Sequence, residues 1–500
     1  MFLLITFSLT IFLFFLSTLV EKLKRSASKG IWETAPGPRP YPIIGSLYLL
    51  GKSSSPFEVF TQLAKKYGSI YSITLGMSPC VVVNSFQHIK EVLISKGGHF
   101  GGRPDFIRFH QLFGGDRNNS LALCDWSELQ KTRRSIARFY CSPRFASANY
   151  DRLNQVGLDE IREFLPELSR MVDENPVVPL KPLIMAACAN MFTSYMCSTR
   201  FSYGDPDFVN MVKLFDEIFW EINQGYAVDF MPWLLPFYNR HMKRLRNWSR
   251  EIRQFILSRI IDHHRNTLDW SAPPRDFTDA LLLHLEKEDD LNWQHIMFEL
   301  EDFLGGHSAI GNLVMLTLAA IVKNPEVGAR IQAEIDQVTS NKREVNLFDK
   351  TEMPYTEATI LETLRTSSSP IVPHVANQDT SIGGYFIKKG CVVFLNNYEL
   401  NTGEQYWSDP LQFKPERFIS NDKILKPEYF IPFSTGKRTC IGQRLVQGFS
   451  FVILAAIMQN YNVTCSETSS IITYPACVAL PPLTFSLKLT RRPDRLPAKD

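Results

Sequence analysis

The chain has 500 residues, of which 45% are hydrophobic and 21% are charged, and its formal net charge is +3. This composition is typical of a folded globular protein and excludes a disordered chain. The near balance of charge argues against a dedicated nucleic-acid-binding protein. Nine cysteines lie far apart with no C-x-x-C pair, which excludes a disulfide scaffold and a zinc-finger array. It indicates a reducing compartment in which most thiols are small buried hydrophobic groups.

The first twenty residues carry no charged side chain and are mostly Phe, Leu and Ile. About 20 apolar residues in a helix span the roughly 30 Å hydrocarbon core of a bilayer. Basic residues, Lys22, Lys24 and Arg25 among them, follow this run and favour a cytosolic location for the next domain. A cleaved signal peptide is the alternative, but it has a shorter apolar core with basic residues in front. We therefore predict a membrane anchor over 1–21.

A proline-rich segment follows the predicted anchor, with four prolines between residues 35 and 45. Because proline fixes φ and cannot continue a helix, we predict a stiff basic and proline-rich linker over 22–46, with an ordinary loop as the alternative. No internal repeat or low-complexity segment divides the remainder. Residues 47–500 are therefore expected to form one catalytic domain.

Hydrophobic periodicity predicts mostly helix from about residue 120 to 370. The stretch 292–323 is apolar on most faces and predicts one long buried central helix that ends before Asn324-Pro325. A second helix is predicted from Pro325 to about Val338, and a last one from near Gly442.

Strand patterns occupy less of the chain. Residues 68–86 predict two strands joined by a turn, and strand character returns at 380–396 with glycine turns. The predicted fold class is therefore mainly α with a small β region.

One ten-residue segment carries the strongest chemical signal: Phe433-Ser-Thr-Gly436-Lys-Arg438-Thr-Cys440-Ile-Gly442. The glycines let the backbone approach something flat and bulky. Cys440 lies at the start of a predicted helix, where the helix dipole and free N–H groups stabilise a thiolate. Such a thiolate can ligate iron, and Arg438 can pair with a carboxylate of the ligand. A buried structural cysteine is the alternative, which five fixed positions disfavour.

This segment resembles the F-x-x-G-x-R-x-C-x-G signature of the cytochrome P-450 family of haem-thiolate monooxygenases, and all five positions match. The resemblance runs from about residue 30 to the end, and includes Phe100-Gly-Gly-Arg103-Pro104. It implies the cytochrome P-450 fold, haem b (iron protoporphyrin IX) as cofactor and Cys440 as the axial iron ligand. The cofactor-binding residues that it implies are Cys440, Arg438, Phe433, Gly436, Gly442, Trp126, Gln130 and His374.

An acid–base pair at helical spacing supports the resemblance. Glu362-Thr-Leu-Arg365 places the two charges at i and i+3 on one helix face. In the family such a pair joins a later arginine in a buried structural triad, here Glu362, Arg365 and Arg417. The spacing alone is weak, since Glu167 and Arg170 share it, and we interpret that second pair as a solvated surface pair.

The sequence departs from the family at a propionate-facing helix. The family pattern is W-x-x-x-R, whereas this chain keeps Trp126 but has Gln130 in place of the arginine. Lys131, Arg133 and Arg134 lie close by and are candidates to supply the missing charge. For Trp126 the alternative is a core aromatic without a ligand.

A second departure lies in the central helix. The family pattern [A/G]-G-x-[D/E]-T-[T/S] reads here Gly305-Gly306-His307-Ser308-Ala309-Ile310. The acid–alcohol pair that helps to deliver protons during oxygen activation is therefore missing. His307 and Ser308 are the candidate catalytic residues of a substitute relay through ordered water, since histidine titrates near neutral pH. A substrate hydroxyl could serve instead, or the reaction could be an isomerisation, desaturation or dehydration. A histidine without a catalytic part is the remaining alternative.

The run Asp302-Phe-Leu-Gly-Gly-His-Ser-Ala-Ile-Gly-Asn312-Leu resembles the Spook/Spookier branch of insect cytochromes P-450, part of the Halloween group of ecdysteroid-synthesis enzymes. The resemblance implies oxidation of a sterol at an early step of moulting-hormone synthesis, downstream of 7-dehydrocholesterol. The rival hypotheses are a xenobiotic-metabolising microsomal monooxygenase, a haem-thiolate isomerase or dehydratase that needs no reductase, and a non-catalytic haem-binding protein.

The chain has no G-x-G-x-x-G nucleotide fingerprint after a strand. The resemblance therefore implies electrons from NADPH through a separate NADPH-cytochrome P-450 reductase, with cytochrome b5 as a second partner. It also implies the endoplasmic reticulum membrane as the location and no nucleic-acid partner. Six cations are interpreted as a docking patch for an acidic protein, with general surface basicity as the alternative: Lys437, Arg438, Arg444, Lys131, Arg133 and Arg134.

The adjacent His263 and His264 lie on a predicted polar helix without acidic or cysteine partners at zinc spacing. We predict that both are solvated.

Overall fold

The computed structural model describes residues 33–493, apart from 52, 54, 288–290 and 466. The predicted anchor over 1–21 and the first part of the predicted linker lie outside these residues. In the described part, one segment, Trp293–Lys323, is long and apolar enough to cross a bilayer. Because 78% of its most apolar window is buried inside the fold, it is a core helix.

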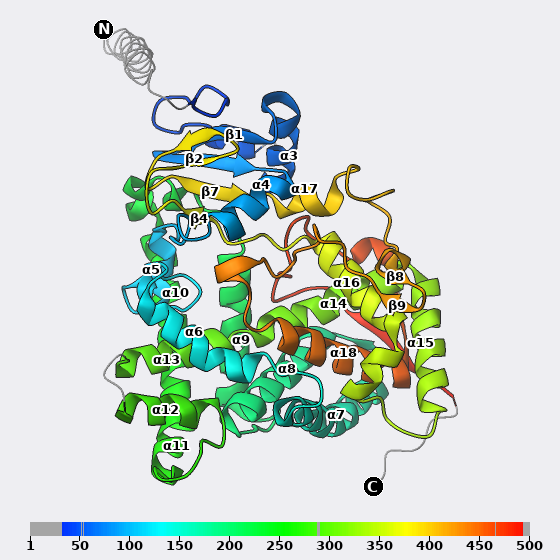
Figure 1. The fold of residues 1–500 in the computed structure, drawn as a ribbon. Helices are drawn as coiled ribbons and strands as arrows, with labels where there is room; N and C mark the ends of the chain where they lie inside the picture. Colours follow the sequence, from blue (N-terminus) through cyan, green and yellow to red (C-terminus); the bar gives the residue numbers. More distant parts are fainter. Residues whose placement is uncertain (1–32, 52, 54, 288–290, 466, 494–500) are drawn as a thin grey trace.

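Helices make up most of the molecule, and the main β-sheet lies at one end of the helical body (Figure 1). The mainly helical fold class is confirmed. The longer helices are α3 (Pro56–Tyr67), α6 (Glu128–Cys141), α7 (Ala148–Glu174), α8 (Leu180–Cys197), α9 (Pro206–Ile222), α10 (Leu235–Ile256), α12 (Phe277–Lys287), α13 (Trp293–Leu304), α14 (His307–Lys323), α15 (Pro325–Thr339), α16 (Pro354–Ser367) and α18 (Gln443–Asn460). Shorter helices are α5 (Ile107–Leu112), α11 (Asp262–Thr267) and α17 (Asn397–Thr402).

The core is built on helices that are apolar nearly all round. Helix α14 packs against α8, α16 and α18, and almost every residue of α8, α14 and α18 is buried. A helix without a polar face is stable only when neighbours cover every side. The predicted helices from Pro325 and near Gly442 are confirmed as α15 and α18.

The predicted central helix is interrupted at its middle. It begins after Asn292, whose side chain accepts from His295 N (3.0 Å), but α13 ends at Leu304 and α14 begins at His307. A Cβ on Gly305 would lie 3.1 Å from the Phe215 ring, and one on Gly306 would lie 3.2 Å from the Phe192 ring. The two glycines therefore let aromatic rings of α9 and α8 approach, and the prediction of one continuous helix is wrong here.

The main sheet has the order β1-β2-β7-β4 and joins strands near the start of the described chain to strands that follow α16. Strands β1 (Ile70–Leu75) and β2 (Ser78–Val83) are antiparallel, which confirms the hairpin predicted over 68–86. Strand β7 (Val392–Leu395) runs parallel to β2, and β4 (His374–Val375) runs antiparallel to β7. This pairing brings the segment after α16 to the N-terminal strands.

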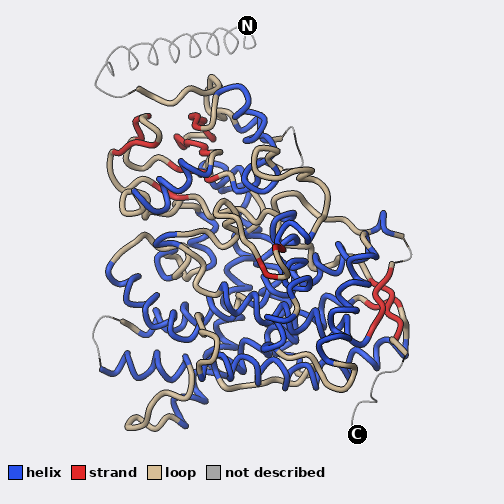
Figure 2. The backbone as a smooth tube through the Cα atoms, turned by 45° about the vertical axis from the view of Figure 1, so that its right-hand side comes forward, coloured by secondary structure: helices blue, strands red, loops and turns tan. Residues whose placement is uncertain are grey.

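Smaller sheets complete the β region. Strands β5 (Thr380–Ile382) and β6 (Tyr385–Ile387) form a hairpin, and β8 (Ile419–Ser420) pairs with β9 (Lys423–Ile424). Strands β10 (Tyr461–Thr464), β11 (Leu487–Arg491) and β3 (Val177–Val178) form a three-stranded sheet away from the main one. Figure 2 shows the strands in separate groups, one of them at the end of the molecule near the N-terminus.

The described part of the predicted linker packs on the domain. Ser72 N in β1 donates to Pro36 O (2.7 Å), and Ser72 Oγ donates to Ala35 O (2.9 Å). A Cβ on Gly37 would lie 1.9 Å from Ser72 O, so only glycine permits this approach. These contacts hold Ala35, Pro36 and Gly37 of the predicted linker against β1.

Candidate active site around Cys440

The Cys440 loop is a tight turn that leads into α18. Its one-turn helix η8 (Gly436–Arg438) precedes the cysteine, and Cys440 N donates to Phe433 O (2.9 Å). Gly436 has φ +73°, and a Cβ there would lie 2.1 Å from Leu93 O in the π-helical turn η1 (Glu91–Ser95). Glycine is thus required both by the left-handed backbone and by the close approach of η1.

We expect Gly436→Ala to weaken folding by at least about 1–3 kcal/mol, because it combines a strained φ with a Cβ that clashes with Leu93 O. Chemical denaturation of the full chain, together with its haem content, measures this. Gly225→Ala is the control, since a Cβ at Gly225 meets nothing within 4 Å. Equal stability of the two variants would contradict the assignment.

Cys440 differs from the other cysteines of the chain. All nine are free thiols, and seven are buried while Cys440 is exposed. The residue as a whole is solvent-exposed, but many protein atoms surround the side chain. The resulting desolvation raises the pKa of the thiol. N–H groups of Gly442 and Gln443 and the charge of Arg134 act in the opposite direction. An accessible sulfur at a helix start is available to a metal.

Two buried arginines flank the loop with unused donors. Arg438 Nη2 donates to Gly101 O (2.5 Å) and Cys124 O (2.6 Å), and Arg134 Nη2 donates to Thr439 O (2.6 Å). Within the described residues, Arg438 Nε, Arg438 Nη1 and Arg134 Nε have no hydrogen-bond acceptor. Buried donors of this kind call for a ligand that accepts.

Arg103 completes a cluster of buried positive charge. Its Nε donates to Ala122 O (3.2 Å) and its Nη1 to Val372 O (2.9 Å). Burial, followed by repulsion from Arg438, lowers the pKa of Arg103 to about 9 and that of Arg134 to about 10. In the part of the chain that is described, no carboxylate forms an ion pair with any of the three. The cluster is therefore suited to an anion.

Gln130 and the three cations that follow it differ in what they contact. Gln130 Nε2 donates to Leu121 O (2.8 Å) and so holds a backbone loop. Arg133 forms a fully buried ion pair with Glu299 (2.9 Å), and Lys131 is exposed. Of the three predicted candidates, only Arg134 contacts the Cys440 loop.

Trp126 lies beside the same loop. Its ring centroid is 5.7 Å from Arg438 Cζ and 5.6 Å from Lys437 Nζ, within reach of cation–π attraction. Trp126 thus orients a predicted cofactor-binding arginine.

The predicted docking patch is smaller than the sequence indicated. Arg133, Arg134 and Arg438 are buried. Lys131, Lys437 and Arg444 remain exposed. The prediction of a six-residue patch is wrong, because three of the six side chains are buried and do not reach the surface.

His374 lies in β4 and is buried. Its Nδ1 is 2.7 Å from Phe100 O, and since a carbonyl only accepts, Nδ1 carries the proton and Nε2 a lone pair. Burial and the charges of Arg103 and Arg438 hold the pKa of His374 well below its usual value. The ring therefore carries its proton on Nδ1, and Nε2 has no hydrogen-bond partner among the described residues.

The predicted core triad lies together in the structure. Arg365 Nε and Nη2 donate to the two oxygens of Glu362 (2.7 and 2.6 Å), and both side chains are fully buried. Arg417 Nε lies 3.4 Å from Glu362 Oε1, and Lys414 N donates to the same oxygen (2.8 Å). The triad thus fixes the segment before the Cys440 loop to α16.

The two candidate relay residues, His307 and Ser308, are buried at the start of α14. His307 Nδ1 donates to Leu304 O (2.5 Å), and its ring meets Phe215 edge to face. Burial lowers the pKa of His307 to about 4, so the ring is neutral near pH 7 and the argument from near-neutral titration no longer applies. His307 Nε2 and Ser308 Oγ have no hydrogen-bond partner among the described residues.

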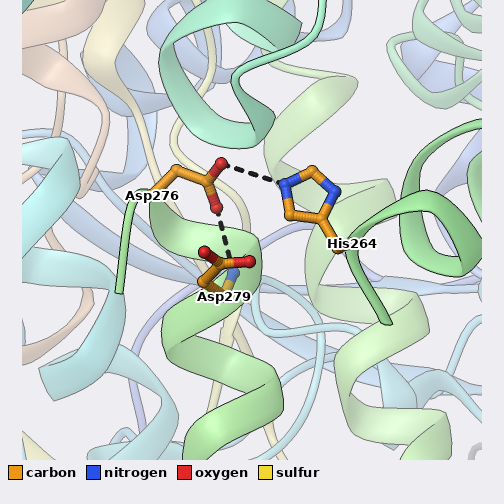
Figure 3. Close-up of side chains that lie close together, drawn as sticks. All are labelled: His264, Asp276 and Asp279. Atoms are coloured by element: carbon orange, nitrogen blue, oxygen red, sulfur yellow. Dashed lines mark hydrogen bonds and ion pairs between the residues drawn. The ribbon is translucent and has the colours of Figure 1, made fainter. Parts of the chain in front are cut away.

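A second polar cluster joins α11 to α12 (Figure 3). His264 Nε2 is 2.9 Å from Asp276 Oδ2, and Asp279 accepts from Arg275 Nε (2.5 Å) and Nη2 (2.9 Å). Although burial opposes it, Asp276 raises the pKa of His264. The prediction that His264 is solvated is wrong, whereas His263 is exposed. Because these charges pair with one another, the cluster is a structural contact between two helices.

Sequence comparisons agree with this site. The sequence model of the family Cytochrome P450 matches residues 35–489. Cytochrome P450 307a1 of Drosophila melanogaster is 52% identical over 483 residues, which cover 92% of this chain and 89% of the relative. Cytochrome P450 1B1 of Mus musculus is 31% identical, over 94% of this chain and 89% of its own length. Cytochrome P450 1A1 of Rattus norvegicus is also 31% identical, over 88% and 86%.

The chain therefore belongs to the cytochrome P450 family and is a monooxygenase. The family implies a haem cofactor, and the residues present fit it. The unused donors of Arg438 and Arg134 suit the two propionate carboxylates of haem. The accessible Cys440 sulfur suits an axial ligand of iron. The sequence did not show which of Lys131, Arg133 and Arg134 contacts the Cys440 loop. It gave Arg103 only as part of a family motif, without a role in binding.

Proposed function

We propose that this monooxygenase oxidises a sterol at an early step of ecdysteroid (insect moulting-hormone) biosynthesis, downstream of 7-dehydrocholesterol. The observation that carries the proposal is the 52% identity with an insect cytochrome P450 over 92% of the chain. The run from Asp302 to Asn312, which resembles the Spook/Spookier branch, supports it.

In this proposal the chain binds haem through the residues around Cys440. When bound, haem supplies the redox chemistry that inserts one oxygen atom of O2 into the substrate. The Cys440 thiolate would hold the iron, Arg438 and Arg134 would bind the propionates, and Phe433 would cover the sulfur. Gly436 and Gly442 give the loop its shape, while Glu362, Arg365 and Arg417 keep it in place. Trp126, Gln130 and His374 would support the propionate side of the haem.

Proton delivery is proposed to pass through Ser308 rather than through a threonine at position 309. Its buried hydroxyl lacks a protein partner and can both accept and donate to an ordered water. His307, held neutral, offers a lone pair at Nε2 that orients such a water.

The membrane location and redox partners are part of the proposal. Large apolar side chains are exposed near the first described residues, Ile43 at 68% and Met77 at 71%. The hydrogen bond from Gly76 N to Ile44 O (3.2 Å) joins the two regions. Exposed apolar side chains support contact with the endoplasmic reticulum membrane beside an N-terminal anchor. Lys131, Lys437 and Arg444 offer positive charge to an NADPH-dependent reductase or cytochrome b5.

The test combines full-length protein in microsomes with NADPH-cytochrome P-450 reductase, and follows 7-dehydrocholesterol and its early oxidation products. We expect NADPH- and reductase-dependent consumption of a sterol and little turnover of a panel of small lipophiles. Turnover of the panel without the sterols would assign xenobiotic metabolism instead. Sterol conversion without NADPH would replace oxidation by an isomerisation or dehydration.

A further inference from the structure

One face of the central helical segment is accessible although the segment lies in the core. Between residues 298 and 319 every residue is buried except Asp302, Gly305, Gly306 and Ala309. These four follow the spacing i, i+3, i+4 and i+7, which places them on one helical face. Ala309 occupies the position where the family has its oxygen-activating threonine. We therefore take this face as a wall of the substrate space.

Asp302 is the charged residue on this accessible face. Its carboxylate accepts from Ser120 Oγ (3.0 Å) and Leu121 N (2.5 Å). Neighbouring carboxylates on other faces are neutralised by arginines, Glu299 by Arg133 and Glu301 by Arg253. Asp302, in contrast, forms no ion pair with any described residue.

The carboxylate retains the capacity to accept another hydrogen bond. An ionised carboxylate has about four acceptor sites, and Asp302 Oδ1 is approached by Ser120 Oγ at 3.2 Å. Burial raises the pKa of this carboxyl to about 6, so most of it is ionised near pH 7, and its negative charge repels anionic ligands and favours a hydrogen-bond donor. A neutral hydroxyl of the ligand can be that donor. Unlike a cationic group, it carries no charge whose desolvation opposes binding.

We infer that the Asp302 carboxylate is a specificity-determining group that accepts a hydrogen bond from a neutral hydroxyl of the bound substrate. This rests on the proposed function, in which the substrate is a sterol that carries a hydroxyl group. Asp302 thereby fixes one end of the substrate, while Ala309 lies about two helical turns further along the same face.

A purely structural role makes a different prediction. Asp302 also holds the backbone at Ser120 and Leu121, and carbonyls of the same loop bind Gln130 and Arg438. Asp302→Asn preserves this loop, because the amide oxygen can accept from Leu121 N and the amide nitrogen can donate to Ser120 Oγ. Ser120→Ala does the reverse. It removes the hydroxyl that accepts from the N–H groups of Ala122 and Leu123, but it leaves the carboxylate in place.

The experiment measures ligand dissociation constants of the full-length haem-loaded protein from ligand-induced difference spectra. Two scaffolds are compared, each as hydroxyl, methyl ether and ketone: 7-dehydrocholesterol with its 3-methyl ether and 3-ketone, and a hydroxylated steroid-sized polycyclic hydrocarbon with its derivatives. Wild type is expected to bind the hydroxyl forms about tenfold or more tightly than the ethers, the usual effect of one hydrogen bond to a charged group. Asp302→Asn should lose this preference and shift it toward the ketones, whereas Ser120→Ala should keep it.

The outcomes separate the inference from the proposed function. Failure of the sterols to bind, with an Asp302-dependent hydroxyl preference on the second scaffold, would overturn the sterol assignment and leave Asp302 in its role. Absence of a hydroxyl preference on both scaffolds would overturn the inference. A hydroxyl preference that survives in Asp302→Asn would also overturn the inference. The same holds if Ser120→Ala abolishes the preference as fully as Asp302→Asn does, since the loop around Ser120 would then be responsible.

Discussion

Cys440→Ser is expected to abolish the carbon-monoxide absorption band that is diagnostic of thiolate-ligated haem, and to lower NADPH-dependent turnover by more than about 100-fold. Serine keeps the size of the side chain, so the loop that begins at Phe433 and leads into α18 can still form. A neutral hydroxyl, however, does not supply the anionic sulfur that donates electron density to iron. The reduced, carbon-monoxide difference spectrum and turnover with reductase measure the two effects.

The matched control is Cys465→Ser. Cys465 is the other cysteine that is not buried, and its thiol lies against Glu467 O in a peripheral turn. This variant should keep both the spectrum and the activity of wild type. Because Arg438 and Arg134 remain, Cys440→Ser should still bind haem, so a changed spectrum with retained haem separates ligand loss from unfolding. A wild-type band in Cys440→Ser would remove Cys440 from the site.

Local patterns in the sequence predicted the elements whose structure depends on neighbours in the chain. The hairpin of β1 and β2 follows from β-branched residues around a glycine turn. In this case the signal lies within a few residues of the structure that it specifies. At Gly436 the sequence indicated a close approach of the backbone, but it did not show that Leu93 O, from a distant part of the chain, is the group that approaches.

Partners across the fold could not be predicted in this way. Arg133 and Arg134 are adjacent and chemically identical, yet one pairs with Glu299 and the other reaches Thr439 O. Successive residues of a helix point about 100° apart, so the choice depends on which elements pack on each side. His263 and His264 are also adjacent and identical. The sequence does not show that His264 is buried against Asp276 while His263 is exposed.

The break in the central helix is a third case. Gly305 and Gly306 lower helix propensity by roughly 1 kcal/mol each, a signal visible in the sequence. The sequence does not show that Phe215 and Phe192 fill the space that the missing side chains leave. A Cβ at either position would meet one of these rings, so the break depends on contacts with α8 and α9 that the sequence does not show.

Glu362→Ala is expected to destabilise the fold by about 3–5 kcal/mol, the usual cost of removing one partner from a buried ion pair. It would leave Arg365, which is fully buried, without a counter-charge, and would release Lys414 N and Arg417 from the oxygen that they share. Because this network fixes the segment before the Cys440 loop, loss of haem should accompany loss of stability. Denaturation midpoints and haem content of the purified full chain measure both.

Glu167→Ala is the matched control, because Glu167 and Arg170 form an ion pair with the same i, i+3 spacing on an exposed helix face. Solvent screens such a pair and both ends stay hydrated, so its removal should leave the denaturation midpoint and haem content unchanged. Glu362→Gln refines the comparison, since it keeps the volume of the side chain and a hydrogen-bond acceptor but removes the charge. If charge balance in the core controls stability, this variant should lie between wild type and Glu362→Ala. If all three variants match wild type, the buried triad does not hold the haem-binding loop in place.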